Sequence, residues 1–137
     1  YERAVSAAVV GGGATSCLER ARYHQAVRDV ATQLSQARAL CMQEGRAVVV
    51  ACEPQSRKLS VDGRPSMAIP ASLEVEWSPA ERPTKDAPAV GEALFVFNPD
   101  GGARGGRLAV LRGGLGVVFR VNWLFGTIEQ AAIAASA

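Results

Sequence analysis

The sequence has very little of what metal centres and hydrolytic active sites require. It contains one histidine, His24, and three cysteines, none of them in a C-x-x-C spacing. Zinc and redox sites need clustered Cys and His ligands. No G-x-S-x-G motif is present, and His24 lies in a helical pattern far from any nucleophile. A Cys3His site could be written formally, but we expect no catalytic residue, no metal ligand and no cofactor.

The three cysteines, Cys17, Cys41 and Cys52, leave two interpretations open. Cys41 lies at the end of a predicted helix and Cys52 at the end of the next predicted strand. A disulfide between these two could form in an oxidising compartment. The pattern favours the other interpretation, in which the thiols are small buried hydrophobes.

Long apolar runs and a strong net charge are also lacking. The stretch from Ala4 to Ala14 falls far short of the ~20 residues that cross a bilayer. It is either a frayed terminus or the end of a membrane helix. The chain starts at Tyr1 without Met and has no signal peptide, so we expect that an upstream segment has been removed. A net charge of +2 demands neither nucleic acid nor an anionic membrane.

One long helical pattern is present, from Ala21 to Glu44. Apolar residues recur there at steps of three and four, which places them on one stripe of a helix. The stripe consists of Tyr23, Val27, Val30, Ala31, Leu34, Ala37 and Cys41. Gly45 follows as a natural left-handed C-cap residue. Beyond it the periodicity changes to that of strands.

About seven short strands follow, separated by turn-rich connections. We expect them at residues 46–52, 58–61, 73–77, 93–97, 108–111, 117–123 and 127–129. In the sixth, Phe119 and Trp123 are predicted to face the core. A helix followed only by strands predicts an α+β fold, with the helix packed on antiparallel sheets and two sheets in contact. We divide this single domain into a helix (1–45), a β domain (46–130) and a mobile tail (131–137).

Two surface features are candidates for binding. The connection at 78–92 is rich in proline and charge, which suggests a contact with a partner or cargo. Its charged candidates are Glu81, Arg82, Lys85 and Asp86. Four arginines between Gly101 and Trp123, with no acidic residue among them, could form a basic edge that meets nucleic acid. They are Arg104, Arg107, Arg112 and Arg120. Because the nearby aromatics are predicted to be core, a solvated edge is the favoured interpretation.

The order of several short motifs resembles the minor pseudopilin H family of the bacterial type II secretion system. The motifs are LSQARA (34–39), EGRAVVV (44–50), IP (69–70), LEV (73–75), FVFNPDGG (95–102), GGRL (105–108) and VNWLFGTI (121–128). Each motif alone is weak, but together they cover most of the chain from Arg20 to Glu129 in the family's order.

The resemblance implies a type IV pilin-like fold, whose long N-terminal helix starts in the inner membrane and carries a globular domain in the periplasm. Such proteins are not enzymes. They assemble through their helices, with H next to the tip pseudopilins I, J and K and the major pseudopilin G. Helix residues for subunit packing would be Val5, Val9, Leu18 and Tyr23. The membrane-embedded first part of that helix would be missing from these residues.

Related H-like domains occur in minor pilins of type IV pili, some of which bind DNA during uptake. That binding relies on a Gly-Arg tail after the last strand. This chain has Phe125 to Gln130 at the matching place, without arginine. The family's Phe-Thr-Leu-Ile-Glu opening also does not occur in these residues. The resemblance thus favours secretion, with DNA uptake as the alternative.

Overall fold

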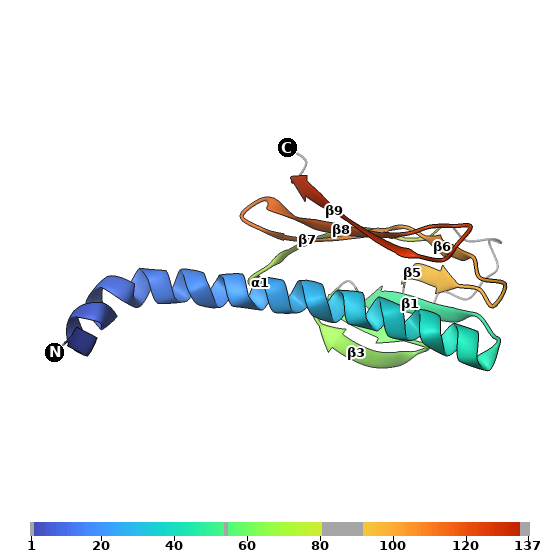
Figure 1. The fold of residues 1–137 in the computed structure, drawn as a ribbon, viewed down its shortest axis with the longest axis horizontal. Helices are drawn as coiled ribbons and strands as arrows, with labels where there is room; N and C mark the ends of the chain where they lie inside the picture. Colours follow the sequence, from blue (N-terminus) through green and yellow to red (C-terminus); the bar gives the residue numbers. More distant parts are fainter. Residues whose placement is uncertain (1, 54, 81–91, 135–137) are drawn as a thin grey trace.

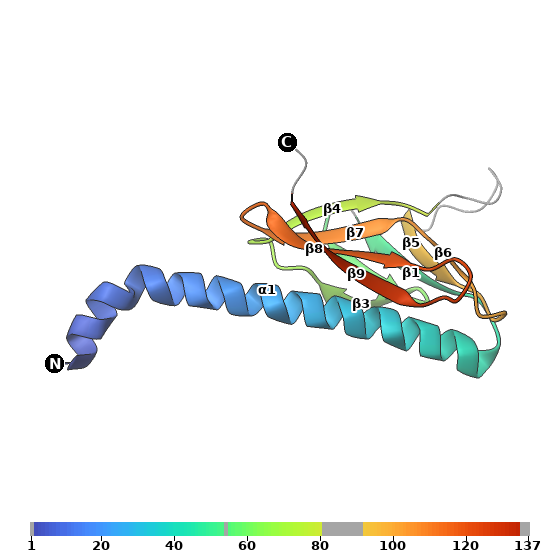
Figure 2. The same cartoon turned by 45° about the horizontal axis from the view of Figure 1, so that its top comes forward.

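A single long helix and two antiparallel sheets make up the protein (Figure 1). The computed structural model describes residues 2–53, 55–80 and 92–134, with the backbone alone for residues 2–16 and 92. Helix α1 (Glu2–Glu44) has 43 residues, a length of about 65 Å at the usual rise per residue. Its N-terminal half projects beyond the sheets, and its C-terminal half lies along them (Figures 1 and 2).

Helix α1 follows the predicted pattern at its C-terminal end. Gly45 has φ +65° and its N–H donates to the Cys41 carbonyl at 2.9 Å, which is the expected left-handed cap. At the other end the helix begins at Glu2, well before the periodic apolar pattern that starts at Ala21. Gly11, Gly12 and Gly13 weaken helix propensity, but no proline interrupts these turns. The helix continues through them.

The described part of the chain contains nine strands, two more than predicted. One sheet has the order β3-β2-β1-β5-β6 and the other β4-β7-β8-β9, with every neighbouring pair antiparallel. The five-stranded sheet comprises β1 (Val48–Glu53), β2 (Lys58–Val61), β3 (Arg64–Ala68), β5 (Glu92–Phe97) and β6 (Ala103–Gly105). The four-stranded sheet comprises β4 (Glu74–Ser78), β7 (Arg107–Arg112), β8 (Leu115–Val121) and β9 (Ile128–Ala134).

The two additional strands, β3 and β6, are the outer strands of the five-stranded sheet. Strand β3 contains Pro65, a residue that argues against a central strand but is tolerated at an edge. It follows a tight turn in which Asp62 and Gly63 both have positive φ, 56° and 79°, as two-residue hairpins require. Strand β6 has only three residues, between glycine pairs, and so gives no periodicity signal.

Two predictions for the C-terminal region were wrong. Strand β8 ends at Val121, so Trp123 lies beyond it in a turn and is exposed, whereas Phe119 is fully buried as predicted. The alanines from Ala131 to Ala134 were expected to be a mobile tail, yet they pair along β8 as part of β9. Backbone hydrogen bonds hold that strand without large side chains. Residues 135–137 lie outside the described residues.

The core lies between the helix and the two sheets. Every three or four residues α1 places a buried apolar side chain in it, as the stripe predicted, and the helix contacts β1, β3, β5, β7 and β9. The buried helix residues are Ala26, Val30, Leu34, Ala37 and Cys41. Each larger one contributes about 1.5–3 kcal/mol through burial. The C-terminal half of the helix therefore packs on both sheets and shares one core with them.

Candidate interaction surfaces

The projecting half of α1 carries the residues that the resemblance assigns to subunit packing. Leu18 is 51% exposed, although leucine gains most from burial. Tyr23 instead lies at the junction, where it packs partly on the domain core and meets the ring of His24 edge-on at 5.2 Å. The side chains of Val5 and Val9 lie outside the described residues. Of the four candidates, Leu18 is thus the one with an apolar side chain shown to be free for a partner.

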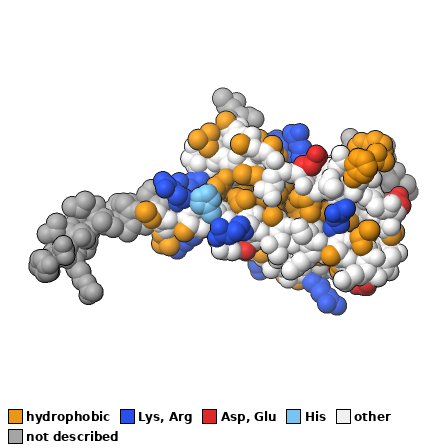
Figure 3. Space-filling model, in the orientation of Figure 1, with side chains coloured by type: hydrophobic (Ala, Val, Ile, Leu, Met, Phe, Trp, Pro, Cys, Tyr) orange, Lys and Arg blue, Asp and Glu red, His pale blue; other side chains and the backbone are white. Residues whose placement is uncertain are grey.

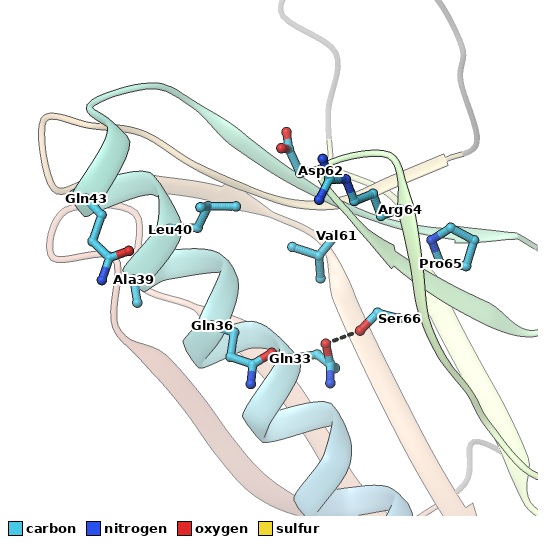
Figure 4. A pocket seen from close by; sticks show the side chains of 10 residues that line it. All are labelled: Gln33, Gln36, Ala39, Leu40, Gln43, Val61, Asp62, Arg64, Pro65 and Ser66. Atoms are coloured by element: carbon cyan, nitrogen blue, oxygen red, sulfur yellow. Dashed lines mark hydrogen bonds between the residues drawn. The ribbon is translucent and has the colours of Figure 1, made fainter.

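The C-terminal half of α1 forms one wall of a groove, with the β2–β3 hairpin as the other wall (Figure 4). The groove has a volume of about 460 Å³. Its helix wall presents the amides of Gln33, Gln36 and Gln43, and the Ser66 hydroxyl donates to Gln33 Oε1 across it. Leu40 adds apolar surface to the same wall. Amides and aliphatic groups can bind a chain segment by hydrogen bonds and packing, and the hairpin wall adds the charged side chains of Asp62 and Arg64.

Asp62, which lines this groove, forms an ion pair with Arg46. Arg46 follows the helix and donates through Nη1 and Nη2 to the two carboxylate oxygens of Asp62, at 2.7 and 2.6 Å, and through Nε to Glu44 at 3.1 Å. The guanidinium holds the pKa of Asp62 below its usual value, and the same bonds raise the pKa of Arg46. The geometry is bidentate, which fixes orientation as well as charge. Its role here is to tie the helix end to the β2–β3 turn.

The four candidate arginines do not gather on one edge. Arg104 lies on β6 in one sheet, while Arg107, Arg112 and Arg120 lie in the other. Arg107 and Arg112 occupy opposite ends of β7, five residues apart, so they face opposite sides roughly 17 Å from each other. Arg120 is exposed on β8 and stands opposite Glu129 of β9. Only Arg107 and Arg120 share a face and a sheet end.

The turn from Trp123 to Phe125, between β8 and β9, is a surface that sequence reasoning missed. Trp123 is 74% exposed, Leu124 54% and Phe125 64%. Figure 3 shows hydrophobic side chains gathered at the end of the domain that is far from the projecting helix, where Figure 1 places the β8–β9 connection. The signal was in the sequence: Asn122 and Gly126 bracket three apolar residues, as a turn would.

The cysteines and the histidine form no reactive group in the described part of the chain. Cys41 and Cys52 are buried free thiols, and burial raises the pKa of both. Cys41 Sγ donates to the Phe97 carbonyl at 3.3 Å, so it packs as a small hydrophobe with a weak donor. Cys17 and His24 are exposed on α1. Within residues 17–53, 55–80 and 93–134 no cluster of three potential metal ligands occurs.

The charged loop residues Glu81, Arg82, Lys85 and Asp86 lie outside the described residues. The residues that flank this loop are described. Ala80 is buried, and its N–H donates to the Ala93 carbonyl at 2.8 Å. The loop therefore leaves and re-enters the domain at closely spaced points.

A helix with enough continuous apolar sequence to cross a bilayer is not found among the described residues. Comparison with known proteins adds no assignment, because no family model, no curated protein and no solved structure matches the chain. The residues and surfaces above therefore carry the functional argument by themselves.

Proposed function

We propose that this protein is a minor pseudopilin of the type II secretion system, a non-enzymatic subunit of a pilin-like assembly. The observation that carries the proposal is the division of α1. One half is packed in the domain core, and the other half projects beyond the domain with Leu18 exposed. A helix that extends past its own domain is suited to packing against helices of neighbouring subunits.

The remaining features agree with such a role. The motif order resembles the pseudopilin H family, and an α+β domain on one N-terminal helix is compatible with a type IV pilin-like fold. The groove between α1 and the β2–β3 hairpin supplies a further surface that could bind a partner. In this proposal an upstream helix segment anchors the protein in the inner membrane. The domain then lies in the periplasm, with pseudopilins G, I, J and K as partners.

The test is a strain that lacks the gene, with secreted hydrolase activity in the medium and transformation frequency measured together. We expect secretion to be lost and transformation to stay normal. Complementation with Leu18→Asp should fail to restore secretion, because a charge on the projecting half disrupts helix packing. Leu115→Asp is the matched control, since Leu115 is 65% exposed at the start of β8 and is not part of α1. Normal secretion in the deletion strain would refute the proposal.

A second candidate function is DNA binding by a minor pilin in a type IV pilus. The exposure of Trp123 favours it, because an aromatic ring beside arginine can stack on a base. This hypothesis predicts binding that falls steeply with salt and weakens when Arg104, Arg107, Arg112 and Arg120 are neutralised. Absence of a gel shift with single- or double-stranded DNA at low salt would eliminate it. Normal secretion with impaired transformation in the deletion strain would support it.

A further inference from the structure

The apolar turn, defined as residues Trp123, Leu124 and Phe125, exposes three large side chains in succession. A soluble surface carries single exposed apolar residues without consequence, but contiguous ones mark contact sites. Tryptophan is among the residues that most often dominate binding energy at protein interfaces. We therefore expect the three exposed side chains to form a binding surface.

Hydrogen bonds hold the backbone of the apolar turn in one shape. The Asn122 side-chain oxygen accepts from the N–H groups of Leu124 and Phe125, at 3.0 and 2.9 Å. The Gly126 N–H donates to the Asn122 carbonyl at 2.9 Å, and the Asn122 N–H donates to the Thr127 carbonyl at 2.8 Å. The turn is thus closed on itself, and these bonds involve none of the three apolar side chains.

Two further bonds fix the turn to the rest of the domain. The Ala103 N–H donates to the Trp123 carbonyl at 3.0 Å, and Arg38 Nη2 on α1 donates to the Phe125 carbonyl at 3.3 Å. Gly126 has φ +69°, and a Cβ there would lie 2.6 Å from the Gly101 carbonyl oxygen. The turn therefore packs closely against Gly101, and this close approach requires glycine at position 126. A rigid contact surface loses little conformational entropy on binding.

Position and charge narrow the choice of partner. The apolar turn lies at the end of the domain away from the projecting half of α1 (Figures 1 and 3), so a membrane that holds the helix would not reach it. Charges of both signs border the turn: Arg38 donates to the Phe125 carbonyl, Arg120 stands opposite Glu129, and Asp100 accepts from the Gly102 N–H. An apolar centre with a polar, charged rim has the composition of a protein–protein interface.

We propose that the apolar turn docks into an apolar cleft on the globular domain of the adjacent pilin-like subunit that lies further from the membrane. This inference rests on the proposed function and names the surface through which the subunit meets its neighbour. A protein fits better than nucleic acid. Leu124 offers no stacking surface, and the carboxylates Asp100 and Glu129, at neighbouring positions, repel phosphate.

The experiment measures binding between this protein and the purified periplasmic domains of pseudopilins G, I, J and K from the same organism. The test variant is the double substitution Trp123→Ala with Phe125→Ala, which leaves the backbone bonds of the turn in place. Leu115→Ala is the control, an equally exposed apolar residue at another turn. We expect the double variant to bind at least ~30-fold more weakly than wild type, and the control to bind normally.

Thermal unfolding of each variant verifies that the fold is intact. Equal binding by wild type and the double variant would overturn the docking surface and leave the secretion role untouched. Absence of binding to all four domains, in an organism where gene deletion still abolishes secretion, would overturn it in the same way. A DNA gel shift that the double variant loses would replace the protein partner by nucleic acid. Normal secretion in the deletion strain would instead refute the proposed function itself.

Discussion

The two halves of α1 have the same backbone but different surroundings. From Ala26 to Cys41 the side chains on one stripe are buried by both sheets, so the domain itself stabilises that half. In the projecting half no described strand lies alongside the helix (Figure 2), and Leu18 is exposed. An isolated helix is marginal in water. The comparison teaches that the domain stabilises one half of the helix through its core, whereas Leu18 in the other half makes no such contribution.

The same contrast recurs over a few residues at the end of β8. Phe119 is fully buried between the sheets, and Trp123 is exposed in the apolar turn. Both are large aromatics at positions of equal parity along the chain, so strand alternation would place them on one face. The difference arises because the strand ends at Val121 and Asn122 turns the backbone. Phe119 therefore serves the fold, and Trp123 is available for binding.

Alanine substitution of Phe119 and Trp123 should give the largest difference in stability between a core residue and a surface residue. Phe119→Ala leaves a cavity in the core, and we expect it to lower the free energy of unfolding by about 3–5 kcal/mol. Trp123→Ala removes an exposed side chain and should change that free energy by less than ~0.5 kcal/mol. Urea unfolding followed by circular dichroism measures both. A large loss of stability in Trp123→Ala would mean that its ring packs on the domain.

The two halves of α1 can be compared in the same way through a pair of leucines. Leu34 is completely buried, so Leu34→Ala should cost about 2–5 kcal/mol. Leu18→Ala should leave the stability of the domain within ~0.5 kcal/mol of wild type, while it weakens assembly with other subunits. The measurement is thermal unfolding of both variants beside a secretion assay. Destabilisation by Leu18→Ala would show that the projecting half also packs on its own domain.

Much of the fold was predictable because its signals are local. The helical stripe ending at Cys41, the Gly45 cap and the Asp62-Gly63 turn each depend on a few neighbouring residues. The α+β class and the two sheets followed from them. Strand β3 escaped prediction because Pro65 argues against a strand, and only its place at the sheet edge makes it acceptable.

The candidate surfaces were less predictable because they depend on where strands end and on how sheets are arranged. Strand alternation assigned Trp123 to the core, because the alternation that starts at Val117 outweighed the weaker turn signal of Asn122 and Gly126. The basic edge was inferred from four arginines close in sequence. In the structure, Arg107 and Arg112 lie at opposite ends of β7 because the strand between them is extended. Position in the sequence gives no distance between residues that lie in different sheets, such as Arg104 and Arg120.

Asn122 offers a smaller and more local test of the apolar turn. Asn122→Ala removes an oxygen that accepts from two backbone N–H groups, which we expect to cost about 1 kcal/mol of stability. Because the three apolar side chains then lose their fixed arrangement, partner binding should weaken more than stability does. Asn122→Asp keeps the acceptor and should restore both. Amide hydrogen exchange at Leu124 and Phe125 provides the direct measurement.

The smallest expected effect is the pH dependence of the ion pair between Arg46 and Asp62. Its guanidinium holds the pKa of Asp62 below the usual value, so the pair stabilises the folded state fully above the unfolded pKa of about 3.9. That contribution is lost as pH falls through the lower, folded pKa. Both side chains are largely solvated, so we expect only a slight change in Tm. Thermal unfolding between about pH 2 and 7 should show a shallower acid dependence in Asp62→Asn than in wild type.

Arg46→Met is the matched control, because it leaves the carboxylate and removes the group that lowers its pKa. We expect it to flatten the acid limb of the Tm curve about as much as Asp62→Asn does, and the double variant to add little. Additive effects would mean that the two side chains act independently. In that case the packing of Leu40 and Val61 on the core and the hydrogen bond from Ser66 to Gln33 hold the helix against the β2–β3 hairpin.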